Sequence, residues 1–161
     1  MPQPSIGDFD RTLSPSVLED RAARGASALV ALGCGEDQSV ALILRNDLTQ
    51  LEIMRAGAKA GTVLVALNWH GATEEVAAIC EDSEAHTVII HRDLIDALRP
   101  ARDGRRVIGV TPDSALRSAY AITDIAASTE PDFPEWNDLV AAHEPLQPTA
   151  LMRPLRRYTS G

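Results

Sequence analysis

The sequence predicts an α/β domain: a layered parallel sheet with helices on both of its faces. Four short apolar runs are nearly continuous and rich in Val and Ile, which is typical of strands buried on both faces. Helical patterns of apolar residues separate these runs, and such alternation produces parallel strands joined by right-handed crossovers. Hydrophobic residues make up 45% of the chain and aromatic residues only 4%, so we expect an aliphatic core.

The first helix is expected after a loosely held, proline-containing lead over residues 1–16. Ser16 is a plausible N-cap, because a serine hydroxyl can accept a hydrogen bond from a free N–H of the first turn. Gly33 lies where a left-handed residue would end the helix. The apolar residues between them recur at helical spacing: Val17, Leu18, Ala22, Leu29 and Leu32.

A strand over residues 39–45, SVALILR, follows this helix. Asn46 and Asp47 then supply N-cap chemistry for the helix LTQLEIMRAGAKAG, which Gly61 ends. The small residues near the end of this helix allow it to lie close to a sheet. A second buried strand, TVLVALN, is expected over residues 62–68.

The alternation continues to the end of a fourth strand. Thr73 is expected to cap a third helix, and TVIIH (87–91) is a third strand. The helix RDLIDALRP should end at Pro100, because proline cannot continue a helix. RRVIGV (105–110) is the fourth strand, so the alternating α/β core is expected over residues 17–110.

The pattern breaks over residues 111–150, where prolines punctuate a polar segment. It contains one clear helix, EWNDLVAAH, over residues 135–143. A connection of this length inside a compact domain is usually functional, and here it could bind a partner. Residues 151–161 are expected to form a strand that leads into the sequence YTSG.

Charge and composition exclude several classes of protein. The formal net charge is -8, which would repel a phosphate polymer, so nucleic acid is not an expected partner. No apolar run approaches the roughly 20 residues that span a bilayer, and the N-terminal residues do not resemble a secretion signal. Cys34 and Cys80 fit no metal spacing and are expected to be separate buried thiols. We therefore expect a soluble, cytoplasmic protein.

Common nucleotide and catalytic motifs do not occur in the sequence. Gly33 and Gly35 begin a G-x-G, but Gln38 occupies the third glycine position and the pair precedes a strand, so the dinucleotide fingerprint fails. The chain has no Walker A sequence and no G-x-S-x-G nucleophile turn. We therefore predict no catalytic residue within this chain.

The histidines do not form a metal site by their spacing. His86 and His91 bracket a strand five residues apart, so they are expected on opposite faces. His143 lies near a helix end, where a contact with the helix dipole explains it. His70 follows a strand in NWHG, at the edge where open α/β sheets bind ligands, yet a turn or packing role with Trp69 is the simpler interpretation.

The sequence YTSG carries chemistry that suits a phosphate group. Thr159 and Ser160 each offer a hydroxyl that can donate to a phosphoryl oxygen, and Gly161 lets backbone N–H groups approach closely. Arg156 and Arg157 would add local positive potential. We expect Thr159, Ser160 and Gly161 to form a phosphate-binding turn at the end of a strand.

Two stretches together resemble the AMP-forming acyl-CoA synthetases, within the larger family that includes adenylation domains and firefly luciferase. Residues 39–90 are similar to two successive strand–helix units of that family, and YTSG looks like the opening of its phosphate loop, YTSGTTGxPKG. Trp136 and Leu139 match a helix between the two stretches, whereas Ala66 stands where the family usually has proline. The landmarks of the first stretch are Asn46, Gly57, Gly61, Leu67, Asn68, Thr73, Glu75, Asp82 and Ser83.

The resemblance implies an ATP-dependent carboxylic acid–CoA ligase. In this family a carboxylate, such as that of a fatty acid, attacks the α-phosphate of Mg-ATP, and the acyl-adenylate then reacts with the thiol of coenzyme A. By position, Thr159, Ser160 and Gly161 would bind the β- and γ-phosphates, while the Mg²⁺-binding acid would lie beyond residue 161. The chain is thus expected to be an incomplete, N-terminal part of an acyl-CoA synthetase-like fold, inactive alone.

Two other interpretations stay open. A fatty acyl-AMP ligase would pass the acyl-adenylate to a carrier protein instead of coenzyme A. A non-catalytic α/β module would bind a partner through residues 111–150. An incomplete ligase is also expected to self-associate through the surface that the rest of the enzyme would cover.

Overall fold

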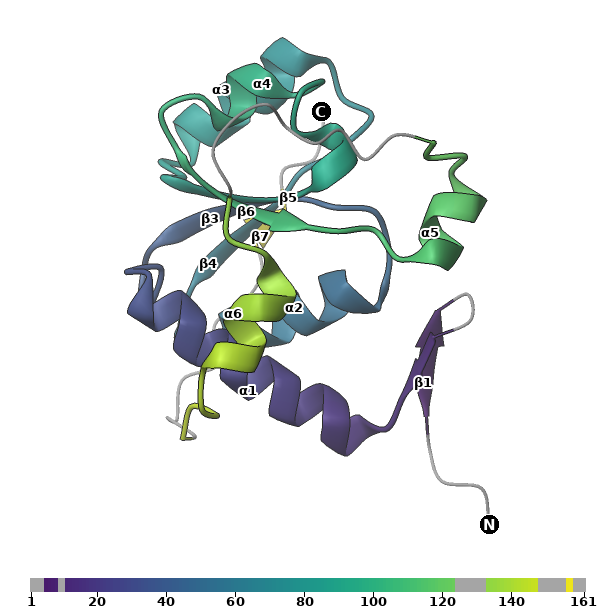
Figure 1. Ribbon diagram of the computed structural model, residues 1–161. Coiled ribbons are helices and arrows are strands. Elements are labelled where there is room, and N and C mark those ends of the chain that lie inside the picture. The colour runs from purple at the N-terminus through teal and green to yellow at the C-terminus, as the bar shows by residue number, and fades with distance from the viewer. Residues whose placement is uncertain (1–4, 9–10, 124–132, 148–155, 158–161) are drawn as a thin grey trace.

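The computed structural model describes residues 5–8, 11–123, 133–147 and 156–157, and its centre is a five-stranded sheet (Figure 1). All neighbouring strands in this sheet are parallel, in the order β6-β5-β3-β4-β7. The predicted parallel α/β architecture is therefore confirmed. The strands are β3 (Ser39–Ile43), β4 (Val63–Ala66), β5 (Thr87–His91), β6 (Arg106–Val110) and β7 (Arg156–Arg157).

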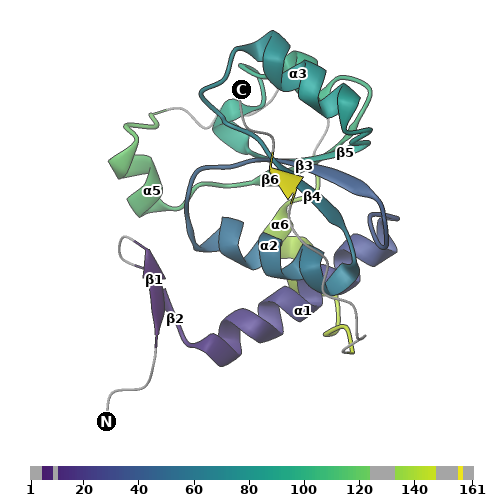
Figure 2. The same cartoon turned by 180° about the vertical axis from the view of Figure 1, so that it is seen from behind.

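Helices lie on both faces of this sheet. They are α1 (Pro15–Ala31), α2 (Leu48–Ala60), α3 (Thr73–Asp82), the 3-10 helix η1 (Arg92–Leu94), α4 (Arg99–Arg102), α5 (Ser114–Ala119) and α6 (Trp136–Ala142). Figures 1 and 2 show α1, α2 and α6 on one face, α3 and α4 on the other, and α5 beyond the end of the sheet. None of the helices in the described ranges has the length and apolar character of a membrane span.

Alternate side chains of the central strand β3 enter two separate apolar cores. Val40 and Leu42 pack with residues of α1, α2 and α6, whereas Ala41 and Ile43 pack with residues of α3 and α4. All four are at most 1% exposed. A strand that is buried on both faces has no solvent-facing position, which explains its continuous apolar run.

The order of the strands reverses at β3. The chain runs from β3 to its neighbour β4 and then crosses back to β5, which pairs with the other edge of β3. In open α/β sheets, ligands bind outside the carboxyl ends of the strands at such a switch point. A functional site is therefore expected among the residues that follow β3 and β5.

The predicted boundaries of α2 are confirmed. Asp47 is the N-cap, and its Oδ1 accepts the N–H of Gln50 at 2.7 Å. Gly61 ends the helix with a φ of 75°, a left-handed conformation that costs glycine no steric strain. Local sequence chemistry therefore determines both ends of this helix.

The start of α1 differs from the prediction, whereas its end does not. Ser14, not Ser16, is the N-cap, and its Oγ accepts the N–H of Val17. Pro15 takes the first helical position, where its missing N–H would have had no partner within the helix. Gly33 follows the helix with a φ of 74°, as expected of a terminating glycine.

Two later boundaries are also corrected. Thr73 does not cap α3, because Ala72 is the N-cap position and Thr73 is already helical. The single helix expected to end at Pro100 is wrong, since the segment forms η1 and α4 instead. Pro100 lies in the first turn of α4, where the absence of its N–H is tolerated.

The expected loose lead over residues 1–16 instead contains an antiparallel hairpin, β1 (Ile6–Asp8) and β2 (Arg11–Leu13). The carboxylate of Asp8 accepts the backbone N–H of Leu48 in the first turn of α2. The hairpin therefore caps a helix that begins about forty residues later. Short-range patterns do not reveal a contact of this kind, because it depends on the folded path of the chain.

The buried thiol of Cys80 provides a test of the apolar core that contains Ala41 and Ile43. Cys34 and Cys80 are both free and buried, as predicted, and Cys80 is 0% exposed. Burial raises the pKa of the Cys80 thiol, while the charge of Arg105 opposes that rise to a smaller extent. The folded thiol thus keeps its proton to a higher pH than the unfolded thiol, whose pKa is about 8.5.

We expect this group to leave the free energy of unfolding unchanged below about pH 8 and to lower it as the pH rises further. Urea unfolding from about pH 7 to about pH 10 measures that slope. The Cys80→Ala variant should show a shallower fall at alkaline pH than the wild type. Equal slopes for the two proteins would contradict the prediction.

Candidate functional site

Four ionisable side chains meet just beyond the carboxyl ends of β3 and β5, and we call Arg45, Asp47, His91 and Asp93 the switch-point cluster. Arg45 and Asp47 follow β3, His91 ends β5, and Asp93 lies in η1. None of these side chains is more than 7% exposed. Sequence reasoning missed Arg45 and Asp93 as site residues. The available signal was Arg45, a charged residue that directly follows the apolar residues 40–44.

Arg45 forms a two-pronged ion pair with Asp93. Nη2 lies 2.7 Å from Oδ2, and Nη1 donates to Oδ1 at 2.9 Å. The guanidinium also lies over the rings of Trp69 and Tyr120, 4.4 Å and 5.1 Å from their centroids. The bidentate pair and the two cation–π contacts hold Arg45 in one position. This side chain thereby joins β3, η1, the turn after β4 and the end of α5.

The His91 ring lies between the end of β3 and the start of α2. Its Nδ1 accepts the backbone N–H of Arg45 at 3.0 Å, and its Nε2 lies 3.5 Å from Oδ2 of Asp47. A neutral imidazole whose Nδ1 accepts a hydrogen bond carries its proton on Nε2. In this tautomer neither nitrogen has a lone pair available for a metal ion.

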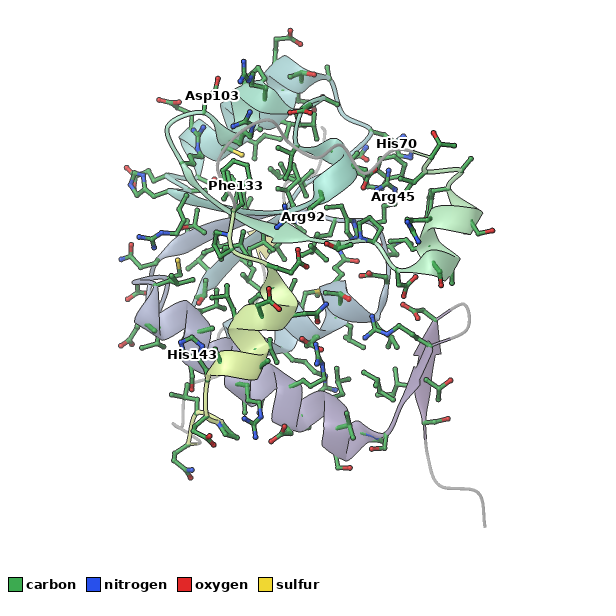
Figure 3. All side chains as sticks on the ribbon, in the orientation of Figure 1. Arg45, His70, Arg92, Asp103, Phe133 and His143 are labelled. Carbon is green, nitrogen blue, oxygen red and sulfur yellow. The ribbon has the colours of Figure 1, made fainter. Side chains whose placement is uncertain are left out.

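His70 takes part in a turn, which supports the simpler of its two interpretations. Its backbone N–H donates to Oδ1 of Asn68 at 3.0 Å, and its ring lies against that of Trp69, with centroids 3.3 Å apart and the two planes tilted by 34°. Figure 3 shows Arg45 and His70 together at the end of the sheet nearest α5. The NWHG sequence thus contributes an aromatic support for Arg45.

The other histidines also have structural explanations. His86 is exposed while His91 is fully buried, so the two do not converge. The Nδ1 of His143 lies 2.7 Å from the carbonyl oxygen of Leu139 at the end of α6. Among the residues that the structure describes, no three His, Cys, Asp or Glu side chains are placed to hold a metal ion.

Tyr120 lies against the Arg45 guanidinium and offers a test of this arrangement. We expect Tyr120→Ala to lower the free energy of unfolding by about 1 kcal/mol, because one cation–π face and an edge contact with Trp69 are lost. Tyr120→Phe keeps the ring and should stay within about 0.3 kcal/mol of the wild type. Urea unfolding measures both, and equal effects of the two variants would show that the ring over Arg45 contributes nothing.

A second buried polar group ties α6 to the body of the domain. Glu52 of α2 is 0% exposed, and its Oε1 accepts the Nε1–H of Trp136 at 2.7 Å. Arg21 of α1 donates to the same carboxylate through Nε at 2.5 Å and Nη2 at 3.1 Å. Arg21 also donates to Oδ1 of Asn137 at 2.7 Å. Glu52 lies four residues from both Leu48 and Ala56, so the three residues share the buried face of α2. Sequence reasoning missed this carboxylate on an otherwise apolar helix face.

Further contacts continue this attachment along α1. The Nη1 of Arg24 donates to the carbonyl oxygen of His143 at 3.0 Å, and the N–H of Leu146 donates to the carbonyl oxygen of Ala23 at 2.9 Å. Before α6, the N–H of Gly109 donates to the carbonyl oxygen of Pro134. Residues 133–147 are thus docked within the domain.

Thr159, Ser160 and Gly161, the sequence-predicted phosphate-binding residues, lie outside the described residues. What the structure describes is the strand before them. β7 pairs in parallel with β4, with Val65 opposite Arg156 and Ala66 opposite Arg157. The carboxyl ends of β7 and β4 therefore lie at the same edge of the sheet as the switch-point cluster.

Comparison with known proteins identifies relatives of this sequence. The sequence model of a family described as AMP-binding enzyme matches residues 3–161. A fatty acid–acyl-carrier-protein ligase of Streptomyces coeruleorubidus is 38% identical over 80 residues, which cover 50% of this chain and 15% of that protein.

Solved structures show the same fold. A benzoate CoA ligase of Burkholderia xenovorans superposes with a TM-score of 0.73 at 21% identity over 91% of this chain. An acyl-CoA synthetase of Brucella canis superposes with a TM-score of 0.74 at 16% identity over 99% of this chain. The matched regions span 27% and 29% of those two chains. The described α/β sheet therefore corresponds to the N-terminal part of a much longer fold.

Proposed function

This chain belongs to the AMP-binding enzyme family, and from that premise we propose that it is part of an ATP-dependent carboxylic acid–CoA ligase. The observation that carries the proposal is the parallel strand β7, whose carboxyl end lies at the edge where such sheets bind ligands. In the sequence, YTSG follows this strand directly. The two free, buried thiols suit an enzyme of the reducing cytoplasm.

The reaction proposed for the whole enzyme has two steps. A carboxylate oxygen of the acid attacks the α-phosphate of ATP, and the bond to pyrophosphate breaks. The thiol of coenzyme A then attacks the acyl carbon, loses its proton, and releases AMP as the thioester forms. Each step develops charge on phosphoryl or acyl oxygens, which fixed hydrogen-bond donors stabilise.

Within this chain, the residues after β7 are proposed to bind the phosphates of ATP. The hydroxyls of Thr159 and Ser160 would donate to oxygens of the β- and γ-phosphates, and Gly161 would let backbone N–H groups approach them. Mg²⁺ would neutralise phosphate charge in such a reaction. By the family resemblance, the acidic residue that would bind it lies beyond residue 161.

A second candidate concerns the acceptor of the acyl group. The curated relative with 38% identity is a fatty acid–acyl-carrier-protein ligase, which favours transfer of the acyl group to a carrier protein. Incubation of the complete enzyme with ATP and an acid, followed by coenzyme A or a phosphopantetheinyl carrier protein, separates the two candidates. If the thioester forms on the carrier protein but not on coenzyme A, the enzyme is a ligase for a carrier protein and not a CoA ligase.

ATP–pyrophosphate exchange tests the shared first step. In the complete enzyme, the double variant Thr159→Ala, Ser160→Ala is expected to lower exchange by about 100-fold, because two phosphate donors are lost. Ser118→Ala in the exposed last turn of α5 is the matched control and should leave exchange unchanged. The 161-residue chain, which spans about a quarter of its structural relatives, should show no exchange. Full exchange by the double variant would overturn the proposed phosphate site.

A further inference from the structure

The chain leaves the sheet at the end of β6 and returns to the same place before α6. The N–H of Thr111 donates to Oε1 of Glu135 at 2.9 Å, and Nε of Arg92 donates to Oε2 of the same carboxylate at 2.8 Å. Beside them, the N–H of Gly109 donates to the carbonyl oxygen of Pro134 at 2.9 Å. The two ends of this excursion are thus tied to each other and to η1, and none of these contacts depends on the position of α5.

The helix α5 makes little buried contact with the rest of the described domain. Leu116 is its buried side chain, and it belongs to neither of the two apolar cores. Ser114, Arg117, Ser118 and Ala119 are exposed. Figures 1 and 2 show the helix beyond the end of the sheet, away from the helices that cover its faces. A segment with few buried apolar contacts opens at a lower free energy than the core of its domain.

Side chains at the two ends of α5 hold it in place. At its start, Oδ2 of Asp113 lies 3.8 Å from Nη1 of Arg11 in the β1–β2 hairpin. Both side chains are partly exposed, so this ion pair contributes little to stability. At its end, the Tyr120 ring lies against the guanidinium of Arg45 and edge-on to Trp69, with the two ring centroids 5.6 Å apart. Tyr120 thus attaches the end of α5 to the switch-point cluster.

The residue that follows this end of α5 has a strained backbone. Ala121 has a φ of 50°, and the N–H of Ile122 donates to the carbonyl oxygen of Arg117 at 2.9 Å. This left-handed helix end usually takes glycine, because a Cβ is crowded there. The strain exists only while the helix end is formed and disappears when α5 opens. It therefore favours the open state.

We propose that α5 is a latch over the switch point, which opens and closes as one unit while the parallel sheet stays folded. In the closed state, Tyr120 packs on Arg45 and Trp69. In the open state, the guanidinium of Arg45 and the indole of Trp69 gain access to solvent at the edge where open α/β sheets bind ligands. The substrates that would reach this edge depend on the proposed ligase function, whereas the opening itself does not.

Native-state hydrogen exchange of the chain, followed by NMR, tests the proposal. The amides to follow are those of Arg117, Tyr120 and Ile122, whose hydrogen bonds form within α5 and at its end, with the amides of β3 as the reference. After correction for intrinsic rates, the α5 amides are expected to exchange at least about 100-fold faster than those of β3. Exchange at the rate of β3 would show that α5 opens only when the whole domain unfolds, and it would overturn the proposal.

A matched pair of variants separates the opening of α5 from global unfolding. Ala121→Gly relieves the strain at the end of α5 and should slow exchange of the α5 amides by about three- to fivefold. Glu84 has the same left-handed conformation at the end of α3, with a φ of 53°. Glu84→Gly should therefore slow exchange of the β3 amides by a similar factor and leave the α5 amides unchanged. Slower exchange of α5 in Glu84→Gly, or no change of α5 in Ala121→Gly, contradicts a separately opening helix.

Tyr120→Ala tests the contact that holds the latch closed. It should speed exchange of the α5 amides by about fivefold, because the ring over Arg45 is lost. Tyr120→Phe keeps the ring and should leave these rates within about twofold of the wild type. A change confined to the amides of residues 120 and 122, with that of Arg117 unaffected, would show fraying of the helix end instead of opening as one unit.

Discussion

Glu52→Gln is expected to lower the free energy of unfolding by about 3 kcal/mol, although the substitution hardly changes the shape of the side chain. The carboxylate is fully buried and accepts three hydrogen bonds, from Arg21 twice and from Trp136 once. An amide has one oxygen and one NH₂ group, so its NH₂ must face a donor. The guanidinium of Arg21 also loses its ion-pair partner.

Urea unfolding followed by far-UV circular dichroism measures this loss. Glu74→Gln makes the same chemical change at an exposed position in the first turn of α3 and should stay within about 0.5 kcal/mol of the wild type. Near-equal stabilities of the two variants would show that the Glu52 network does not stabilise the fold. A loss in Glu52→Gln accompanied by greater solvent exposure of Trp136 would locate the damage at α6.

Gly25→Ala is expected to lower the free energy of unfolding by about 2 kcal/mol, even though alanine favours a helix by about 1 kcal/mol over glycine. A Cβ at this position would lie 2.6 Å from Cζ2 and 2.8 Å from Cη2 of Trp136. It would also lie 3.1 Å from the Cβ of Ala56. The indole ring is rigid and fully buried, so the helices must move apart to admit the methyl group.

The control for this steric effect is Gly35→Ala, where the added carbon would meet its neighbours at 3.5 Å or more. That variant should change stability by less than about 0.5 kcal/mol. In the background of Trp136→Phe, whose smaller ring lacks the crowding atoms, Gly25→Ala should cost at least about 1 kcal/mol less than in the wild type. Additive effects of the two substitutions would contradict the proposed contact.

Both predictions concern the same contact region between α1, α2 and α6. Glu52 supplies the polar contact there, and Gly25 supplies the space into which Trp136 fits. Together they attach residues 133–147 to the domain before the chain returns to the sheet as β7. The attachment gives a physical reason why a long, proline-containing connection can belong to the fold itself.

The sequence predicted the elements that depend on neighbouring residues. The continuous apolar run of β3 indicated a strand covered on both faces, and Asp47 with Gly61 marked the ends of α2. Where two local signals competed, the prediction failed. Ser14 and Ser16 are both possible caps, and Pro15 between them decided for the earlier one. Pro100 was expected to stop a helix, but it lies in the first turn of α4.

Sequence reasoning noted a ligand-binding edge only for His70 and did not predict the switch-point cluster. Parallel strands place their carboxyl ends at one edge, so the edge itself followed from the sequence pattern. The pairing of Arg45 with Asp93 did not, because the two residues are 48 positions apart and each, taken alone, is an ordinary charged residue. The same holds for Trp136 and Glu52, which are 84 positions apart.

The sequence by itself thus determined the fold class, the boundaries of α2 and the resemblance to the acyl-CoA synthetases, since each depends on periodicity, local capping or a linear motif. The tertiary structure alone decided which buried polar groups become partners. A buried charge or N–H is stable only when a partner of opposite character lies within hydrogen-bond distance. Such a distance between residues remote in the chain is set by how helices and strands pack, and no short-range pattern encodes it.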